Sequence, residues 1–358
     1  MKSRLSQLKS LLKKSNCTHI LVTDIVDVRY FSGFRSTQAF LLVSKSDNYL
    51  ISDFRYKEAG KEHCAQTGEW EFFEYNKSGF GFLAEIAPPS SRIGIQSNIV
   101  TLDQFDDLKR QCNKCIFVKL STTVSSLCIP KFSSEITAMA SAARIGDRAL
   151  KSVLPRLKTG ITEKEAAAEL EALCARFGSE KPSFDTIVLF GARSALPHGQ
   201  PSSAQLRKGD WILVDFGCTV DGFCSDMTRT MVYGKAGPKQ KEIYAVVLKA
   251  RKNARTHARA GITAAGLDRH ARSIIKDHGF GDYFGHGTGH GVGLRIHEAP
   301  RVASAVKSRL PANAVVTIEP GIYLPDFGGV RIEDMILLEK NGNRVLTHSP
   351  RRLLELGV

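Results

Sequence analysis

The sequence lacks a long apolar run. None of its 358 residues falls in a stretch approaching the roughly 20 apolar residues of a membrane-spanning helix. The first fourteen residues also lack the apolar core of a secretory signal, and their four leucines follow helical spacing instead. With 42% hydrophobic and 24% charged residues, the composition is that of a globular protein with ample core. We therefore expect a cytoplasmic protein without a membrane partner.

Cysteine is sparse. Eight cysteines in 358 residues do not suggest a disulfide scaffold, so we expect reduced thiols. Cys112 and Cys115 have the spacing of a zinc or redox pair, but no second pair stands at a matching distance. A functional role for this pair stays a minor alternative.

Acidic residues are fewer than basic ones, 36 against 50, which gives a formal net charge of +14. Such a charge can indicate a nucleic-acid partner. Here, however, the basic residues are scattered apart from a few short clusters, and no aromatic residues are interleaved with them in a binding pattern. We therefore do not expect nucleic acid as a partner, and a basic protein surface is the simpler interpretation.

The length favours two domains. The chain up to about residue 127 alternates short apolar strands with helical stretches, which is typical of a small α/β domain. Pro130, Ser133 and Ser134 indicate a boundary, and we place the domains at residues 1–130 and 131–358.

The second domain opens with long helices. We expect helices over 135–157 and from the capping box of Thr162 and Glu165 to about 177. Further helices are expected near 240–258 and 264–277. Long helices beside a mostly antiparallel, hairpin-connected sheet indicate the α+β class.

Five side chains of this domain form a candidate metal site: Asp215, Asp226, His290, Glu319 and Glu333. Asp215 and Glu319 each end an apolar strand-like run. A carboxylate buried there needs a cation, a basic partner or a proton. Four carboxylates and one imidazole are an oxygen-rich set that suits one or two divalent ions able to activate water. The pattern predicts a dinuclear metal centre.

Local sequence favours convergence of these residues. Asp221-Gly222 is a hairpin turn signal that would bring Asp226 back beside Asp215, although Asp226 could instead cap a turn. Glycine at every odd position from 285 to 293 disfavours a helix and favours an extended segment that other backbone can approach closely. This segment would present His290 as a ligand and His286 close behind the ligands.

Arg331 lies two residues before Glu333. On one strand the two side chains would share a face, where Arg331 could hold ligand carboxylates in place. An ordinary surface ion pair between Arg331 and Glu333 is the alternative.

The order of these motifs resembles the creatinase/prolidase family of pita-bread metallopeptidases, and segment 27–34 is similar to the family's amino-terminal domain. The resemblance covers nearly the whole chain and rests on these stretches: Leu213-Val214-Asp215-Phe216-Gly217, Ser225-Asp226-Met227-Thr228-Arg229-Thr230, Gly285-His286-Gly287-Thr288-Gly289-His290-Gly291-Val292-Gly293, Ile318-Glu319-Pro320-Gly321 and Val330-Arg331-Ile332-Glu333-Asp334. It implies an α+β pita-bread catalytic domain preceded by a smaller creatinase-type α/β domain.

The resemblance also implies the chemistry. Two divalent ions would be bound by the five residues, with Asp226 and Glu333 bridging, and His198 and His297 would contact substrate or the tetrahedral intermediate. By sequence alone either histidine could be a surface residue. We expect Mn²⁺, with Co²⁺, Zn²⁺ or iron as alternatives, and a homodimer. Glu319 would take a proton from water and pass it to the leaving nitrogen.

The expected substrate is a peptide with proline at the second position. We expect an aminopeptidase that cleaves between the N-terminal residue and that proline. An Xaa-Pro dipeptidase is the alternative, since the two differ only in substrate length. A non-catalytic binding protein of the same fold is a third reading, which predicts that no metal is bound.

Overall fold

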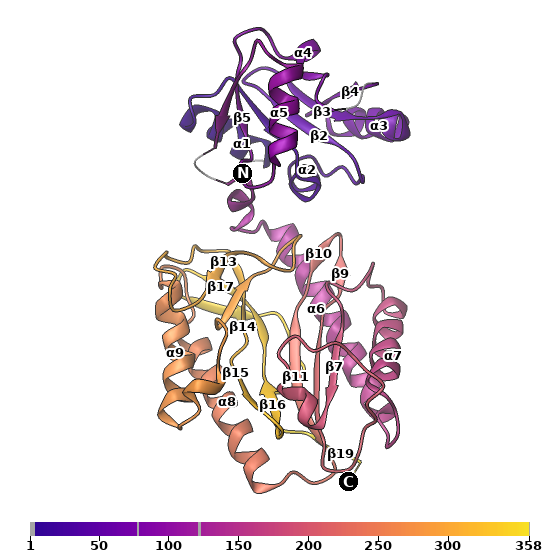
Figure 1. Cartoon of the computed structure of the whole chain (residues 1–358), viewed down its shortest axis with the longest axis vertical. Helices are drawn as coiled ribbons and strands as arrows, with labels where there is room; N and C mark the ends of the chain where they lie inside the picture. Colours follow the sequence, from indigo (N-terminus) through magenta and orange to yellow (C-terminus); the bar gives the residue numbers. More distant parts are fainter. Residues whose placement is uncertain (1–3, 77–78, 121–122, 358) are drawn as a thin grey trace. The chain divides into compact units, whose positions relative to one another are not determined.

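The structure is a computed structural model that describes residues 4–76, 79–120 and 123–357 (Figure 1). The chain forms two compact units, Met1–Cys128 and Ile129–Val358. Among the described residues, no helix is both long and apolar enough to cross a membrane.

The first unit is built on a six-stranded sheet with strand order β4-β3-β2-β1-β5-β6. The pairs β1–β2 and β2–β3 are antiparallel, and the other neighbours are parallel. The strands are β1 His19–Val22, β2 Phe40–Val43, β3 Asn48–Ser52, β4 Glu71–Glu74, β5 Arg92–Ile95 and β6 Ile116–Lys119. The apolar runs at 20–22, 40–43, 49–51, 93–95 and 116–118 predict β1, β2, β3, β5 and β6, which are confirmed. The half-exposed β4 is not predicted by such a run.

The helices of the first unit are α1 Arg4–Lys14, α2 Ile25–Ser32, α3 Lys57–Thr67, α4 Leu83–Ile86 and α5 Leu102–Gln111, with 3₁₀ turns η1 Phe54–Tyr56 and η2 Val124–Cys128. Helix α1 buries all four of its leucines, as its spacing predicts. The sheet packs with Phe80, Phe82 and Leu83 in one apolar core. Mixed pairing with helices between strands makes this unit an α/β domain.

The second unit contains α6 Ser133–Val153, α7 Glu163–Arg176, α8 Pro238–His257 and α9 Ala264–Asp277, with 3₁₀ turns η3 Leu154–Arg156, η4 Gly191–Ala195 and η5 Gly281–Tyr283. The predicted capping box before α7 is present. The Thr162 hydroxyl accepts the N–H of Glu165 at 3.2 Å, and the Glu165 carboxylate accepts the N–H of Thr162 at 2.8 Å. Helices α6 to α9 confirm the four helices that the sequence predicts in this unit.

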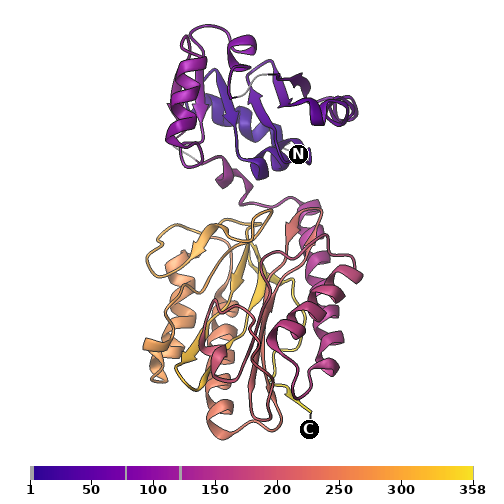
Figure 2. The ribbon, with the colours of Figure 1, turned by 45° about the vertical axis from the view of Figure 1, so that its right-hand side comes forward.

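Two main sheets lie between these helices (Figures 1 and 2). One has the strand order β19-β11-β8-β7 and the other β13-β12-β14-β17-β18, and two further pairs are β9–β10 and β15–β16. The strands are β7 Ile187–Phe190, β8 Trp211–Phe216, β9 Thr219–Val220, β10 Phe223–Cys224, β11 Met227–Tyr233, β12 Gly289–Gly291, β13 Glu298–Val302, β14 Val315–Ile318, β15 Gly321–Leu324, β16 Gly328–Arg331, β17 Asp334–Glu339, β18 Gly342–Val345 and β19 Glu355–Leu356.

Two apolar cores hold these layers together. Helices α6 and α7 share one core with β7, β8 and β11. Helices α8 and α9 share the other with β14, β16 and β17. Mostly antiparallel sheets covered by long helices confirm the α+β class expected for this unit.

The predicted hairpin turn is confirmed. Asp221 and Gly222 both adopt left-handed backbone conformations, with φ of 51° and 79°. Such a pair matches the right-handed twist of the flanking strands β9 and β10. Beyond the hairpin, β11 returns antiparallel to β8 and sets Thr228 opposite Asp215.

The expectation that Arg331 and Glu333 lie on one strand is wrong. Strand β16 ends at Arg331 and β17 begins at Asp334, so Glu333 occupies the interruption. The two strands have different partners, since β16 pairs with β15 and β17 with β14. The chain therefore has to change direction between the partners, and periodicity within one strand could not reveal that change.

The glycine-rich segment allows close backbone approach, as its composition predicts. A Cβ atom on Gly289 would collide with the carbonyl oxygen of Thr317, whereas one on Gly285 would meet nothing within 4 Å. We expect Gly289→Ala to lower the free energy of unfolding by about 1–3 kcal/mol, because β12 and β14 must move apart. Gly285→Ala is the matched control in chemical denaturation. Equal stability of the two variants would contradict the expected backbone clash.

Candidate active site

Interruptions of strands position most of the candidate metal ligands. Asp226 directly precedes β11, Glu319 lies between β14 and β15, and Glu333 lies between β16 and β17. Asp215 is on β8 and His290 is the central residue of β12. A strand end lets a polar side chain turn out of the sheet while the apolar neighbours stay in the core.

The structure brings these residues together. Ligand atoms of Asp226, His290 and Glu333 all lie within 4.8 Å of one another. Nε2 of His290 is 3.5 Å from Oδ2 of Asp226 and 3.4 Å from Oε1 of Glu319. The three carboxylates and the imidazole therefore surround one small volume.

Asp215 and Glu333 join the same cluster through hydrogen bonds. The Thr228 hydroxyl donates to Oε2 of Glu333 at 2.7 Å and accepts Nε–H of Arg331 at 2.9 Å. The same guanidinium donates to Oδ2 of Asp215 at 2.6 Å. Thr228 and Arg331 thus fix the two carboxylates relative to each other.

The electrostatics of the cluster are unfavourable without a cation. Burial raises the pKa of Asp226 well above its ordinary value, and the nearby Glu333 and Asp215 raise it further. Burial likewise raises the pKa of Glu333 well above its ordinary value, with Glu319 and Asp215 adding to the shift. The pKa of Glu319 rises to about 7, again chiefly through burial. Crowded, buried carboxylates resist ionisation because their negative charges repel one another in a poorly solvated space.

The donor set fits divalent cations. Four carboxylates face one guanidinium, that of Arg331. If all four ionise, three negative charges have no compensating side chain among the described residues of the cluster. Among the described residues, Oδ1 of Asp215 is buried and has no hydrogen-bond partner. Carboxylate oxygens with one imidazole nitrogen are ligands that Mn²⁺, Co²⁺ and Zn²⁺ accept.

His290 is suited to such a site because it is neutral. Burial lowers its pKa to about 4, so Nε2 has a free lone pair at neutral pH. Nδ1 lies 3.0 Å from the carbonyl oxygen of Gly291, to which it can donate. That hydrogen bond would fix the tautomer with Nε2 directed at the carboxylates.

His286 lies behind the cluster rather than in it. Its Nε2 is 2.9 Å from the hydroxyl of Tyr323, which in turn accepts from Arg331 at 2.8 Å. Burial lowers the pKa of His286 to about 4. Through Tyr323 and Arg331, His286 is linked to the Asp215 carboxylate. Its role behind the candidate ligands stays a prediction.

His297 and His198 lie at the edge of the cluster. The ring of His297 packs against that of His290, with centroids 4.3 Å apart. Burial lowers the pKa of His297, and the proximity of His198 lowers it further. The carbonyl oxygen of Pro197 accepts from Arg331 at 3.2 Å, which ties the His198 segment to the site. Both side chains are exposed, as groups that contact a substrate must be.

Sequence reasoning did not identify Thr228, Tyr323 or Arg229 as part of the site. Thr228 offered a signal, because it lies two residues after Asp226 and shares a face with it by strand periodicity. Tyr323 and Arg229 had no comparable signal, since their partners are distant in the sequence.

Arg229 clamps the backbone at Thr228, two residues after Asp226, and at the candidate ligand Glu333. One terminal nitrogen donates to the carbonyl oxygen of Thr228 at 2.9 Å and also to that of Glu333. The other donates to the Asp334 carboxylate at 2.8 Å, and this buried carboxylate is also paired with Arg251 and Arg351. Arg229 is only 2% exposed, so the surrounding residues fix the position of its guanidinium group.

We expect Arg229→Lys to weaken metal binding by about 10–100-fold, because one ammonium cannot hold both carbonyl groups. Calorimetric titration with Mn²⁺ measures this change. Arg344→Lys, an exposed position near Glu339, is the matched control. Unchanged affinity in a folded Arg229→Lys protein would show that the clamp has no bearing on the ligands.

Two protein-family models match the chain. The model of Metallopeptidase family M24 matches residues 137–340, and that of the Creatinase/Prolidase N-terminal domain matches residues 4–127.

Relatives match along the whole chain. A Pyrococcus furiosus protein named Xaa-Pro dipeptidase is 37% identical over 356 residues, covering 99% of this chain and 100% of the relative. A solved Xaa-Pro dipeptidase from Bacillus anthracis has a TM-score of 0.92 at 36% identity, with 99% of each chain covered. A solved X-Pro aminopeptidase from Thermotoga maritima has a TM-score of 0.89 at 33% identity, covering 99% of this chain and 100% of the other.

Proposed function

Because this chain belongs to metallopeptidase family M24 and carries a creatinase/prolidase N-terminal domain, we propose that it hydrolyses the peptide bond before a proline, as an Xaa-Pro dipeptidase. The observation that carries the hydrolytic proposal is the buried cluster of carboxylates around a neutral His290. The dipeptide preference rests on the relatives, among which the name Xaa-Pro dipeptidase recurs. They favour what the sequence had suggested only as the alternative.

The five ligands would be Asp215, Asp226, His290, Glu319 and Glu333. Divalent cations held there would supply Lewis acidity, which polarises the scissile carbonyl and acidifies water. We propose Mn²⁺ as the native ion. A homodimer and a cytoplasmic location complete the proposal.

The side chains would share the remaining work. Glu319 lies beside the proposed ligand nitrogen of His290 and can hold a proton, so it would accept one from the attacking water and deliver it to the leaving nitrogen. His297 and His198 would donate hydrogen bonds to the carbonyl oxygen as negative charge develops on it. Arg331 and Thr228 would keep Asp215 and Glu333 in place.

Peptide length tests the proposal. With Mn²⁺ present, we expect rapid cleavage of Xaa-Pro dipeptides and little cleavage of Xaa-Pro-Yaa tripeptides or of Xaa-Ala dipeptides. Comparable kcat/KM for dipeptide and tripeptide would instead favour the aminopeptidase, the activity named for the Thermotoga maritima structure. A protein that cleaves neither and binds no divalent ion would be the non-catalytic binding protein.

A further inference from the structure

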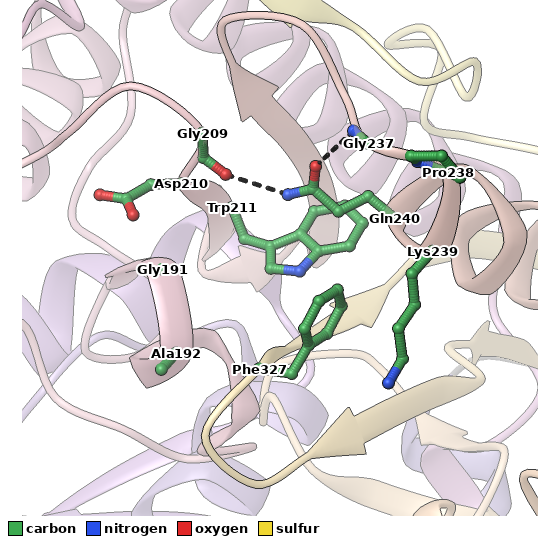
Figure 3. A pocket seen from close by; sticks show the side chains of 10 residues that line it. All are labelled: Gly191, Ala192, Gly209, Asp210, Trp211, Gly237, Pro238, Lys239, Gln240 and Phe327. Carbon is green, nitrogen blue, oxygen red and sulfur yellow. Dashed lines mark hydrogen bonds between the residues drawn. The ribbon is translucent and has the colours of Figure 1, made fainter.

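A pocket lies at the opposite end of β8 from the cluster of carboxylates. It has a volume of about 340 Å³ and is lined by residues of four segments. Trp211 begins β8, whereas Asp215 lies four residues further on, roughly 13 Å along an extended strand. The other walls are the start of η4, the beginning of α8 and Phe327 from the turn between β15 and β16 (Figure 3).

The indole of Trp211 supplies an unused donor. Trp211 is 1% exposed, and its Nε1 has no hydrogen-bond partner among the described residues. Figure 3 shows this nitrogen directed to the part of the pocket bordered by Phe327. The two rings meet edge to face, with centroids 6.4 Å apart and an interplanar angle of 81°. An aromatic ring is only a weak hydrogen-bond acceptor for an N–H group, so a ligand oxygen would be a stronger acceptor for Nε1.

The start of α8 adds positive potential. Its first turn has no acidic residue, so the positive end of the helix dipole is not compensated within the helix. The N–H of Gly237 is taken by the Gln240 side chain at 2.8 Å. The N–H groups of Lys239 and Gln240 belong to the first turn, where no intrahelical acceptor exists.

Lys239 adds a positive charge beside Phe327. Its Nζ lies 4.8 Å from the centre of the Phe327 ring, at the border of the pocket. The exposed side chain can swing over a ligand that sits against this ring.

The one acidic residue of the lining is turned aside. Oδ2 of Asp210 accepts the N–H of Arg207 at 2.8 Å, and Figure 3 shows this carboxylate on the opposite side of the pocket from Lys239. Burial raises the pKa of Asp210.

We propose that this pocket binds a small organic carboxylate whose apolar part lies against Phe327. The carboxylate oxygens would accept from Nε1 of Trp211 and from the start of α8, with Lys239 as counter-ion. Phe327, Pro238 and Ala192 provide the apolar walls. A neutral molecule of the same shape would leave the ammonium and the helix end unused.

Tryptophan fluorescence reports on the pocket directly. The chain has two tryptophans, so Trp70→Phe leaves Trp211 alone. In this background we expect cyclohexanecarboxylate to give a saturable change with a roughly millimolar dissociation constant. Cyclohexanecarboxamide, the uncharged analogue, should give none. Lys239→Gln should weaken binding about tenfold, whereas Lys252→Gln, an exposed lysine later in α8, should leave it unchanged.

Three results would overturn the proposal. They are the absence of a saturable response to the carboxylate, equal responses to carboxylate and amide, and equal affinities of the two lysine variants. A response to inorganic phosphate alone would overturn the assignment to carboxylates. Calorimetry with the Trp211→Phe protein checks the indole separately, since loss of its N–H should weaken binding while the pocket stays apolar.

Discussion

Replacement of Glu319 by glutamine is expected to lower kcat on an Xaa-Pro dipeptide by about 10²–10⁴-fold. The two side chains have the same shape, but the amide cannot accept and release a proton. Glu319 is held by the Thr317 hydroxyl at 3.1 Å and lies 3.4 Å from Nε2 of His290, so the substitution keeps the packing and removes the chemistry.

The measurement needs the loaded protein. Metal content and circular dichroism should show that the Glu319→Gln protein is folded and still binds the ion. Glu339→Gln, on the exposed end of β17, is the control and should retain full turnover. Near-normal turnover of a loaded Glu319→Gln protein would remove Glu319 from the proposed mechanism.

The metal-free protein is expected to lose stability as the pH rises from about 4.5 to about 7. Burial raises the pKa of Glu319 from 4.5 to about 7, so in this range the folded state holds a proton that the unfolded state has released. The stabilisation that comes from this proton is therefore complete below the pKa of Glu319 in the unfolded state. It is lost as the pH rises through the pKa of Glu319 in the folded state. While the folded state holds one proton more than the unfolded state, the free energy of unfolding falls by about 1.4 kcal/mol for each pH unit of increase. Asp226 and Glu333, whose pKa values are also raised, act in the same direction.

Chemical denaturation in the presence of a chelator, across this pH range, measures the loss. Mn²⁺ should abolish it, because the cation compensates the carboxylates. Asp226→Asn should reduce the slope and remove most of the stabilisation by Mn²⁺, whereas Asp282→Asn, an exposed position, should do neither. A metal-free protein that gains stability over this range would contradict the crowding of buried carboxylates.

Local patterns predicted much of the second unit. The capping box of Thr162 and Glu165 and the turn at Asp221-Gly222 depend on residues within three positions of each other, and both are present. Helices α8 and α9 could also be predicted, because the spacing of apolar residues reflects a helix's own periodicity. The break between Arg331 and Glu333 could not be predicted, since it arises from the different partners of β16 and β17.

The sequence by itself predicted which side chains would converge. Asp215 and Glu319 end apolar runs, and a buried carboxylate needs a cation, a basic partner or a proton, so composition and spacing predicted a metal centre. Their roles as ligands stay predictions. Only the tertiary structure decided what holds them: Thr228 between Glu333 and Arg331, Arg229 across two backbone carbonyls, and Tyr323 between Arg331 and His286. These contacts join residues up to about a hundred positions apart, and a hydrogen bond between such partners leaves no periodic trace in the sequence.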